Sequence, residues 1–468
     1  MNNSNDTTSQ QSSSVHPHQV TAAQSHRTKS VDDTNNELSL FFAHSVDQLS
    51  IQSPTYLDLF KNTPDSWIKR SSHMIELTGR HPYNAEPPAK LLMEYLITPT
   101  TLHYVRNHGT VPKLDINTHK LVIRTIDKQY QYTVHELLDK YSDCIDEFPI
   151  YMACDGNRRK ELNMIKHSEN FNWSIGGGGC SIWKGIRLAE LLRKLDVDIN
   201  NTAYHNKSMY IHFTGADELT NGRYGTSIPL AYVMDTTNDV LLATQQNGEI
   251  LTPDHGYPIR VMLGGMVGGR AVKWLDSIEI SDHESTNFYH IHDNTILPQS
   301  IDSQTKANMG HWYNKSQYKL YESYINSVIT TPINEQLIDM TQQELLTVRG
   351  YAHNGNGVPV IDVEVSLDDG ATWLQCNLEF PDNYRRYGFK TYSWCHWSIE
   401  LPSYQLFQAP SIVCRAWDRQ RQTQHRIPNW NLHGMGMNAW YIVKIHALKP
   451  NSIRFIHPVL QGNEPGML

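Results

Sequence analysis

No stretch of this chain approaches the roughly 20 consecutive apolar residues that a helix needs to cross a bilayer. The chain begins without the apolar core of a secretory signal, and its first 25 residues contain no arginine or lysine, unlike a mitochondrial presequence. Cysteine is scarce: six residues are scattered without a CxxC pair, a pattern typical of a reducing compartment. The sequence therefore predicts a cytosolic protein.

Motifs for several common cofactors are absent as well. We find no GxGxxG, GxxxxGK[ST], HExxH or CxxCH motif, and the glycine runs at 176–179 and 264–269 fit neither dinucleotide nor phosphate-loop spacing. We therefore expect no NAD, flavin, ATP or haem to bind this chain. The net charge of -8 and the lack of a large basic block exclude general nucleic-acid binding, because phosphates require many cationic contacts.

Composition divides the chain into three parts. Its 468 residues, 39% hydrophobic and 19% charged, suffice for two or three globular domains. Residues 1–37 are mostly Ser, Thr, Gln, Asn and His and predict a disordered tail. Residues 38–325 predict a mixed α and β domain, and residues 326–468 carry alternating strands that favour a β-sandwich. The expected fold class is α+β.

Local patterns predict individual elements. AKLLMEYL (89–96) follows two prolines and predicts a helix, whereas residues 181–195 predict a loop that enters a second helix. The runs KLVIRTI, VLLAT, WCHWSIEL and SIVCRAWD predict strands. PVIDVEVSLDDGATW (359–373) predicts a half-buried strand before an Asp-Asp-Gly turn, with these side chains pointing inward: Ile361, Val363, Val365 and Leu367.

The stretch YMACDGNRRKELN (151–163) combines a thiol with adjacent arginines. Cationic neighbours are expected to lower the pKa of Cys154, and a soft thiolate prefers soft or high-valent metals to magnesium or calcium. Arg158 and Arg159 offer planar, permanently charged groups for an oxyanion. Two interpretations are open at this point: a metal-bound thiolate beside an anion pocket, or a buried structural cysteine beside surface arginines.

Other segments combine rigid Pro and Gly with His, Arg or Lys. They are HPYNAEPP (81–88), ITPTTLHYVRNHGTVP (97–112), TPDHGYPIRV (252–261), GGRAVKWL (268–275), NSVITTP (326–332) and WNLHGMGMNAW (430–440). Together with CDGNRRKELNM they resemble the eukaryotic sulfite oxidase and nitrate reductase family of molybdenum enzymes over roughly residues 75–465. The resemblance implies a sulfite oxidase-like molybdopterin-binding domain followed by an immunoglobulin-like dimerisation domain, and hence a homodimer.

The resemblance also implies roles for individual residues. Cys154 corresponds to the single protein ligand of the molybdenum, which is otherwise held by molybdopterin. Arg106 and Arg159 would form the substrate pocket, and Trp173 would line it. The residues that would hold the pterin and its phosphate are Arg106, His108, His255, Arg260 and Lys273. Simpler explanations are a turn residue for His255, a solvated strand end for Lys273 and a core position for Trp173.

Two branches of this family run opposite oxygen-atom transfers, on nitrate or on sulfite. Asn294 stands where nitrate reductases have asparagine and sulfite oxidases an active-site tyrosine, and Met435 matches a methionine typical of nitrate reductases. His433 stands where sulfite oxidases carry arginine. Fewer cations suit a monoanion, so the sequence favours reduction of nitrate to nitrite. The alternative is a haem-free sulfite oxidase.

Three positions depart from the family pattern: His433, Asp155 directly after the ligand cysteine, and the tetraglycine at 176–179, which is expected to loosen the pocket. A carboxylate at Asp155 opposes a positive pocket unless Arg158 neutralises it. A cofactor-binding or dimer-forming relative without catalysis is therefore a third alternative. The resemblance further implies an electron donor, either haem and flavin domains of a longer chain or a separate protein.

Overall fold

The computed structural model describes residues 60–198, 208–448 and 451–459. The polar tail expected over residues 1–37 lies outside the described residues. Among the helices of the described residues, none is both long enough and apolar enough to cross a membrane. All six cysteines are buried free thiols.

The N-terminal half of the described chain is built on two five-stranded sheets. The first has the order β11-β10-β7-β6, with a further strand, β12, paired to β10. All its pairs are antiparallel, and β6 pairs with β7 along its whole length, from Ile145↔Ile186 to Ala153↔Gly178. Its strands are β6 (Ile145–Ala153), β7 (Gly178–Arg187), β10 (Leu241–Gln246), β11 (Glu249–Ile250) and β12 (Arg260–Met262).

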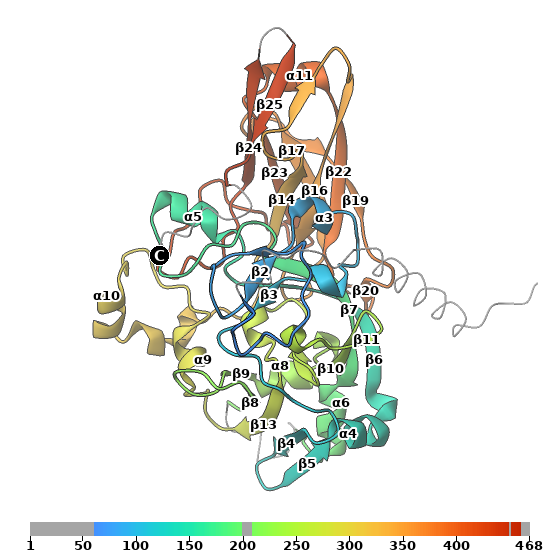
Figure 1. The fold of residues 1–468 in the computed structure, drawn as a ribbon, viewed down its shortest axis with the longest axis vertical. Helices are drawn as coiled ribbons and strands as arrows, with labels where there is room; N and C mark the ends of the chain where they lie inside the picture. Colours follow the sequence, from blue (N-terminus) through green and yellow to red (C-terminus); the bar gives the residue numbers. More distant parts are fainter. Residues whose placement is uncertain (1–59, 199–207, 449–450, 460–468) are drawn as a thin grey trace, which may run out of the picture. The chain divides into compact units, whose positions relative to one another are not determined.

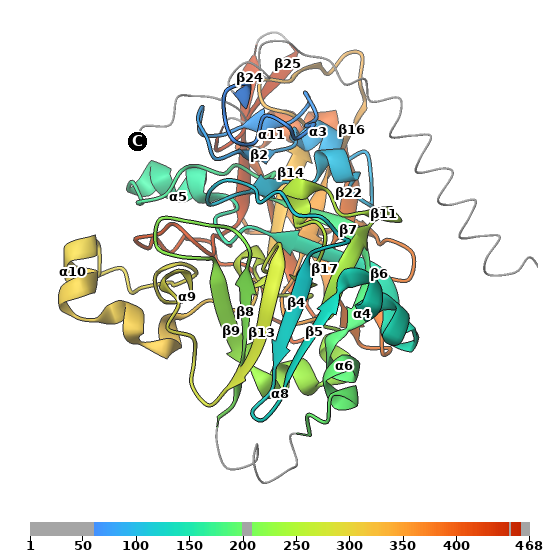
Figure 2. The same cartoon turned by 60° about the horizontal axis from the view of Figure 1, so that its bottom comes forward.

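Figure 2 shows the strands of the second sheet side by side, in the order β5-β4-β13-β8-β9. Only β4 and β13 run parallel, and the predicted strand KLVIRTI is β4. The predicted strand VLLAT lies in β10 of the first sheet. The bounds are β4 (Lys120–Arg124), β5 (Gln129–Thr133), β8 (Tyr210–Gly215), β9 (Gly225–Pro229) and β13 (Leu275–Ser281).

Helices in this half are short, and α4, α9 and α10 begin at a side-chain N-cap. In α4 (Val134–Lys140), Thr133 and Glu136 form a reciprocal capping box. Apolar side chains of α4 and α6 complete the core that covers the second sheet. The other helices are α3 (Ala89–Leu92), α5 (Arg159–Ile165), α6 (Leu188–Lys194), α8 (Leu230–Met234), α9 (Phe288–His292) and α10 (Gln304–Met309). A small antiparallel sheet joins β1 (Ile75–Glu76), β2 (Asn84–Glu86) and β3 (Val105–Arg106).

Two local predictions were wrong because long-range contacts override local pattern. The helix expected over 89–96 ends at Leu92, and beyond it the carbonyl of Leu96 accepts a hydrogen bond from the Trp394 indole N–H at 2.8 Å. The loop expected at the start of 181–195 is part of β7, and only its second half is helical, as α6.

The C-terminal half is a β-sandwich, shown in orange and red in Figure 1. One sheet has the order β14-β16-β22-β19 and the other β15-β25-β24-β23-β17-β18. Helix α11 (Ser403–Gln408) follows β22. The strands are β14 (Asn326–Thr331), β15 (Leu337–Asp339), β16 (Leu345–His353), β17 (Val360–Ser366), β18 (Leu374–Gln375), β19 (Asn377–Glu379), β22 (Cys395–Pro402), β23 (Ser411–Asp418), β24 (Tyr441–Leu448) and β25 (Ser452–Ile456).

The strand predicted around Val363 exists as β17, but one side chain points the other way. Val363 and Val365 are buried, whereas Ile361 is 41% exposed. The register of β17 against β23 shifts between Val360 and Asp362, and such a bulge reverses the inward and outward alternation. WCHWSIEL and SIVCRAWD form β22 and β23, as predicted.

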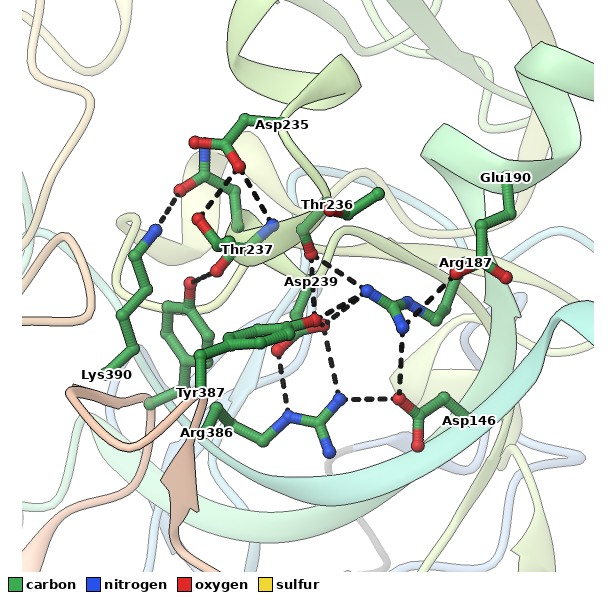
Figure 3. A network of polar contacts seen from close by, with 12 residues as sticks. Asp146, Arg187, Glu190, Asp235, Thr236, Thr237, Asp239, Arg386, Tyr387 and Lys390 are labelled. Atoms are coloured by element: carbon green, nitrogen blue, oxygen red, sulfur yellow. Dashed lines mark hydrogen bonds and ion pairs between the residues drawn. The ribbon is translucent and has the colours of Figure 1, made fainter.

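A polar network joins the two halves, and Figure 3 shows it from close by. It centres on the buried carboxylate of Asp239, which accepts hydrogen bonds from Arg386 Nε at 2.9 Å and Tyr387 Oη at 2.6 Å. Arg187 approaches the same carboxylate at 3.2 Å. Arg386 and Tyr387 belong to the hairpin of β20 (Arg385–Arg386) and β21 (Lys390–Thr391). This hairpin reaches from the sandwich half to the N-terminal half.

Candidate active site

One cavity contains most of the residues proposed for the site. It encloses about 920 Å³ of empty space, its open mouth included. Nine of the eleven candidate residues line it: Arg106, His108, Cys154, Arg159, His255, Arg260, Lys273, Asn294 and Met435. These residues come from segments that lie up to 329 positions apart in the sequence, between Arg106 and Met435. We call this space the active-site cavity.

Cys154 is placed by the end of β6. Strand β6 ends at Ala153. The Cys154 N–H donates to the carbonyl of Gly177 at 2.8 Å, which continues the pairing between β6 and β7 by one residue. The chain then turns, since the N–H of Asn157 donates to the carbonyl of Cys154 at 3.0 Å. Its sulfur accepts from the Gly156 N–H at 3.4 Å and lines the cavity. The turn presents the sulfur at the cavity wall.

The expectation of a lowered thiol pKa was wrong. Burial, followed by the adjacent carboxylate of Asp155, raises the pKa of Cys154 to about 12. Arg159 and Arg106 act in the opposite direction but are outweighed. The sulfur is therefore a protonated thiol until an electrophile replaces the proton, as a metal ion does on binding.

The two adjacent arginines have separate roles. Arg158 has a left-handed backbone with φ of 67°, so its side chain turns away from the cavity and forms a buried ion pair with Glu161 at 2.7 Å. It does not neutralise Asp155. Arg159 is the first residue of α5 and lines the cavity; its Nε donates to the carbonyls of His433 and Gly434 at 2.9 and 3.0 Å. These contacts fix the Arg159 guanidinium.

Arg106 supplies the second cation of the pocket. It ends β3, and its Nη1 donates to the Asn107 carbonyl at 2.5 Å and to Asn84 Oδ1 at 3.3 Å. Its guanidinium carbon lies 5.3 Å from the centre of the Phe171 ring, a cation–π distance. Phe171 also binds Arg159, whose Nη1 donates to the Phe171 carbonyl at 2.8 Å. One segment thus positions both guanidinium groups.

Asn294 is held in a strained backbone conformation with φ of 51°. Its carbonyl accepts from the Leu320 N–H at 2.7 Å and from Arg270 Nη2 at 3.4 Å, and its amide Nδ2 donates to Tyr224 Oη at 3.3 Å. Gly269 gives the side chain its space, because a Cβ there would lie 2.1 Å from Asn294 Oδ1. The backbone contacts, the Tyr224 hydroxyl and the space left by Gly269 together position the amide.

Met435 reaches the cavity from the sandwich half. Asn431 closes the loop around it: the Met435 N–H donates to Asn431 Oδ1 at 3.1 Å, and Asn431 Nδ2 donates to the Met435 carbonyl at 2.8 Å. Gly434 in this loop has φ of 61°, and a Cβ there would lie 2.7 Å from Arg159 Cγ. The glycine therefore permits both the turn and the close approach of Arg159.

Trp173 and His433 do not line the cavity. Trp173 is fully buried and packs edge-on against Tyr104, which does line it, with ring centres 5.8 Å apart. His433 points to Tyr313, with its Nε2 2.9 Å from the Tyr313 hydroxyl, and only its backbone carbonyl contacts Arg159. Burial lowers the pKa of His433 to about 4, so this imidazole is neutral near pH 7. Both residues support the wall from behind.

The four remaining candidates are basic side chains that form one wall of the cavity. Lys273 Nζ donates to the carbonyls of Arg106 and Asp254 at 2.9 Å each, and burial with nearby Arg260 lowers its pKa to about 7. Burial also lowers the pKa of Arg260 to about 10 and that of His255 to about 4. His108 Nε2 lies 3.1 Å from Asp293 Oδ2. Burial destabilises the charged forms of these side chains, so a bound anion would stabilise those charged forms.

Several residues of the site were missed by the sequence. Asp217, Tyr224, Asp254 and Asp293 line the cavity, and three of them are carboxylates that temper its positive charge. Asp254 lies within a quoted motif and Asp293 directly precedes Asn294, whereas Asp217 and Tyr224 lie outside every quoted motif. No spacing rule distinguishes a carboxylate that lines a cavity from one on the surface.

Glu86 is the most buried of the overlooked groups. Its carboxylate accepts from the Ser174 N–H at 3.1 Å, from the Ser174 hydroxyl and from the Gly176 N–H at 3.2 Å. The segment around Ser174 is also hydrogen-bonded to the turn that follows Cys154, because the Arg158 N–H donates to the Ser174 carbonyl at 2.7 Å. Glu86 therefore anchors the segment that supports Cys154.

The tetraglycine does not loosen the pocket, contrary to expectation. All four glycines are buried, and Gly178 and Gly179 are paired residues of β7. A Cβ at Gly178 would lie 2.2 Å from Tyr151 Oη, and one at Gly179 would lie 3.0 Å from His103. The run is a site of close packing.

The donor set fits the molybdopterin cofactor. His255 Nε2 and Arg260 Nε are buried without a hydrogen-bond partner in the described part of the chain, so the wall can still bind an anionic ligand. Residues 60–198, 208–448 and 451–459 contain no group of three or more His, Cys, Asp or Glu side chains that could hold a metal ion. A metal at Cys154 would thus take its other ligands from a cofactor.

Comparison with known proteins agrees with this geometry. A family model described as "Oxidoreductase molybdopterin binding domain" matches residues 108–289, and one described as "Mo-co oxidoreductase dimerisation domain" matches residues 317–448. A nitrate reductase [NADH] of Brassica napus is 42% identical over 418 residues, covering 87% of this chain and 45% of that protein. A nitrate reductase [NADH] of Cucurbita maxima is 39% identical over 467 residues, covering 97% and 50%. The chain spans about half the length of these relatives.

A solved structure shares the fold. The sulfane dehydrogenase SoxCD from Paracoccus pantotrophus superposes with a TM-score of 0.61 at 20% identity, covering 88% of this chain and 94% of that one. At this identity the likeness concerns the fold alone. It agrees with the expected order of a molybdopterin-binding domain followed by a dimerisation domain.

Proposed function

Since this chain belongs to the molybdopterin oxidoreductases of the sulfite oxidase and nitrate reductase family, we propose that it reduces nitrate to nitrite in the active-site cavity. The relatives named nitrate reductases support this substrate. When bound, molybdopterin supplies a metal that exchanges two electrons and an oxygen atom with the substrate.

The charge of the pocket is the observation that carries the proposal. Arg106 and Arg159 face the cavity together with the carboxylates of Asp155 and Asp293. His433, where the sulfite branch has arginine, is neutral and turned toward Tyr313. Two guanidinium groups partly balanced by carboxylates suit a planar monoanion better than a pyramidal dianion.

The chain's own residues then have defined tasks. Arg159 and Arg106 bind nitrate through their planar guanidinium groups, which their backbone contacts hold in place. Asn294 orients the bound anion with its amide, and Met435 and Phe171 exclude water from that side. Cys154 would hold the molybdenum. His108, His255, Arg260 and Lys273 would hold the pterin and its phosphate.

The test is the rate ratio for the two anions in the purified, molybdenum-loaded protein. We expect nitrite formation from nitrate with a reduced viologen as donor, and little sulfite oxidation. Molybdenum content is measured in the same samples, and Cys154→Ser should abolish turnover. Bound molybdenum without nitrite formation, or faster turnover of sulfite, would reject the proposal.

Organisation and partners complete the proposal. We infer a catalytic domain over residues 38–325 and a sandwich over 326–468, in agreement with the start of β14 at Asn326. The sandwich would form a homodimer, because a dimerisation-domain model matches it. Electrons would come from a haem or flavin protein, in the same chain or a separate one. A cytosolic location fits the sequence.

A further inference from the structure

A second cavity reaches the ligand cysteine from the boundary between the two domains. It encloses about 350 Å³ of empty space, its mouth included. Cys154 and Asp155 line both this space and the active-site cavity. Its other wall is made by His353 at the end of β16 and by the segment that connects the domains, around Glu322 and Tyr324. We call it the second cavity.

The second cavity is lined by buried polar atoms that have no protein partner. Asp155 Oδ2 and both ring nitrogens of His353 lack a hydrogen-bond partner among the described residues. His353 is only 4% exposed, with its ring stacked on Tyr151 at a centre-to-centre distance of 4.3 Å. Buried polar groups of this kind are normally satisfied by ordered water when the space allows it. The second cavity has room for water beside these atoms.

The cavity also has an outer end in solvent. Tyr324 is 45% exposed and Glu322 is exposed, and both line the same space as Cys154. Glu322 at the exposed end and Asp155 beside Cys154 thus line the same cavity.

We propose that the second cavity holds a chain of ordered water molecules that delivers protons to the active-site cavity. This role of the water chain rests on the proposed function, in which nitrate takes up two electrons and two protons and yields nitrite and water. The electrons come from the donor protein, and the protons end on the oxygen atom that leaves nitrate as water. Substrate and cofactor occupy the active-site cavity, so a separate inlet keeps the proton supply open.

His353 is suited to hold such a chain without carrying charge. Burial, with nearby Arg158, lowers its pKa to about 3, so the ring is neutral near pH 7 and has one donor and one acceptor nitrogen. A neutral ring can accept a hydrogen bond from one water and donate to the next. Asp155 Oδ2 then accepts from the innermost water.

The test replaces His353 by phenylalanine, which keeps a ring against Tyr151 and removes both nitrogens. His396→Phe is the matched control: His396 is also a buried neutral histidine of this sheet, in β22, but it lines neither cavity. Both variants are compared as molybdenum-loaded enzymes for nitrate turnover in H2O and D2O. A high-resolution crystal structure of the unmodified holoenzyme is determined in parallel.

We expect a continuous chain of waters between Glu322 and Asp155 in the crystal structure. In His353→Phe, kcat should fall about tenfold or more, since positioned proton transfer contributes ~10²–10⁴-fold, and the solvent isotope effect should rise. KM for nitrate and the behaviour of His396→Phe should stay unchanged. A dry or interrupted second cavity, or equal kcat and isotope effects in the two variants, would overturn the proposal.

The crystal structure separates this inference from the proposed function. If the molybdenum-loaded protein turns over no nitrate, the proposed function is rejected. The electron density in the second cavity still decides whether the chain of water molecules exists. A dry cavity in an active nitrate-reducing enzyme removes the inlet and leaves the proposed function intact.

Discussion

The guanidinium of Arg158 meets the carboxylate of Glu161 through two parallel contacts, Nε to Oε1 and Nη2 to Oε2, each of 2.7 Å. Arg158 is fully buried, and its Nη1 donates to Asn326 Oδ1 at 2.7 Å and to the Ala439 carbonyl at 2.8 Å. Both of these acceptors belong to the sandwich half. The pair therefore fastens the turn that follows Cys154 to the sandwich half, whereas Arg159 lines the active-site cavity.

Replacing Arg158 by alanine should destabilise the whole protein. The change leaves the buried Glu161 carboxylate without its partner, and breaking such pairs costs about 3–5 kcal/mol of unfolding free energy. Urea denaturation followed by circular dichroism measures it. Lys128→Ala is the control, because its ion pair with Asp196 is solvent-exposed and should contribute nothing measurable. Equal denaturation midpoints for the two variants would contradict the fastening role.

Glu86 should make stability depend on pH. Burial raises its pKa from 4.5 to about 7, although hydrogen bonds from Ser174 and Gly176 act against this. The folded protein thus holds this proton more tightly than the unfolded chain. The resulting stabilisation is complete below about pH 4.5 and is lost as pH rises through about 7.

A glutamine at position 86 keeps the acceptor and cannot ionise. Glu86→Gln should match the wild type near pH 4.5 and exceed it above pH 7, by on the order of 3 kcal/mol. Urea midpoints over a pH series measure this difference. Glu86→Ala should be destabilised at every pH, because it leaves the buried donors of Ser174 and Gly176 unpaired. A pH-independent difference between Gln and wild type would argue against the raised pKa.

Much of the fold could be predicted from the sequence, and the failures have a common cause. Strands with period-two alternation, such as β22 and β23, carry their own signal. Strand β7 does not, because its glycines read as a loop and its pairing with β6 and β10 comes from distant segments. The exposed Ile361 depends on a bulge opposite β23, which no local pattern encodes.

The candidate site was predicted as a set of residues but not as an environment. Nine of the residues that the family resemblance implies line one cavity of the folded chain. The direction of the Cys154 pKa could not follow from its arginine neighbours, because burial outweighs them. Glu86 bonds to Ser174, 88 positions away, so only the folded chain shows that it supports the site.

The hairpin of β20 and β21, whose contacts are drawn in Figure 3, should hold the two halves of the chain together. Asp239→Ala removes the buried acceptor of Arg386, Arg187 and Tyr387 and should cost about 3–5 kcal/mol of unfolding free energy. Hydrogen exchange should accelerate in β20 and β21 before it does so in the sandwich core. Asp143→Ala, at an exposed ion pair with Lys194, provides the control. Unchanged exchange in the hairpin would show that other contacts hold it.

Gly269 should control the substrate site through Asn294. An alanine Cβ would lie 2.1 Å from Asn294 Oδ1, so the amide must move, whereas the backbone at 269 lies outside the left-handed region and accepts alanine. Losing one hydrogen bond to a charged substrate costs about 1.5–3 kcal/mol, so KM for nitrate should rise roughly tenfold to hundredfold in Gly269→Ala. A double-mutant cycle with Asn294→Ala locates the cause. If the effect passes through the amide, adding Gly269→Ala to Asn294→Ala changes KM no further; additive losses would mean that Gly269 acts on another part of the cavity.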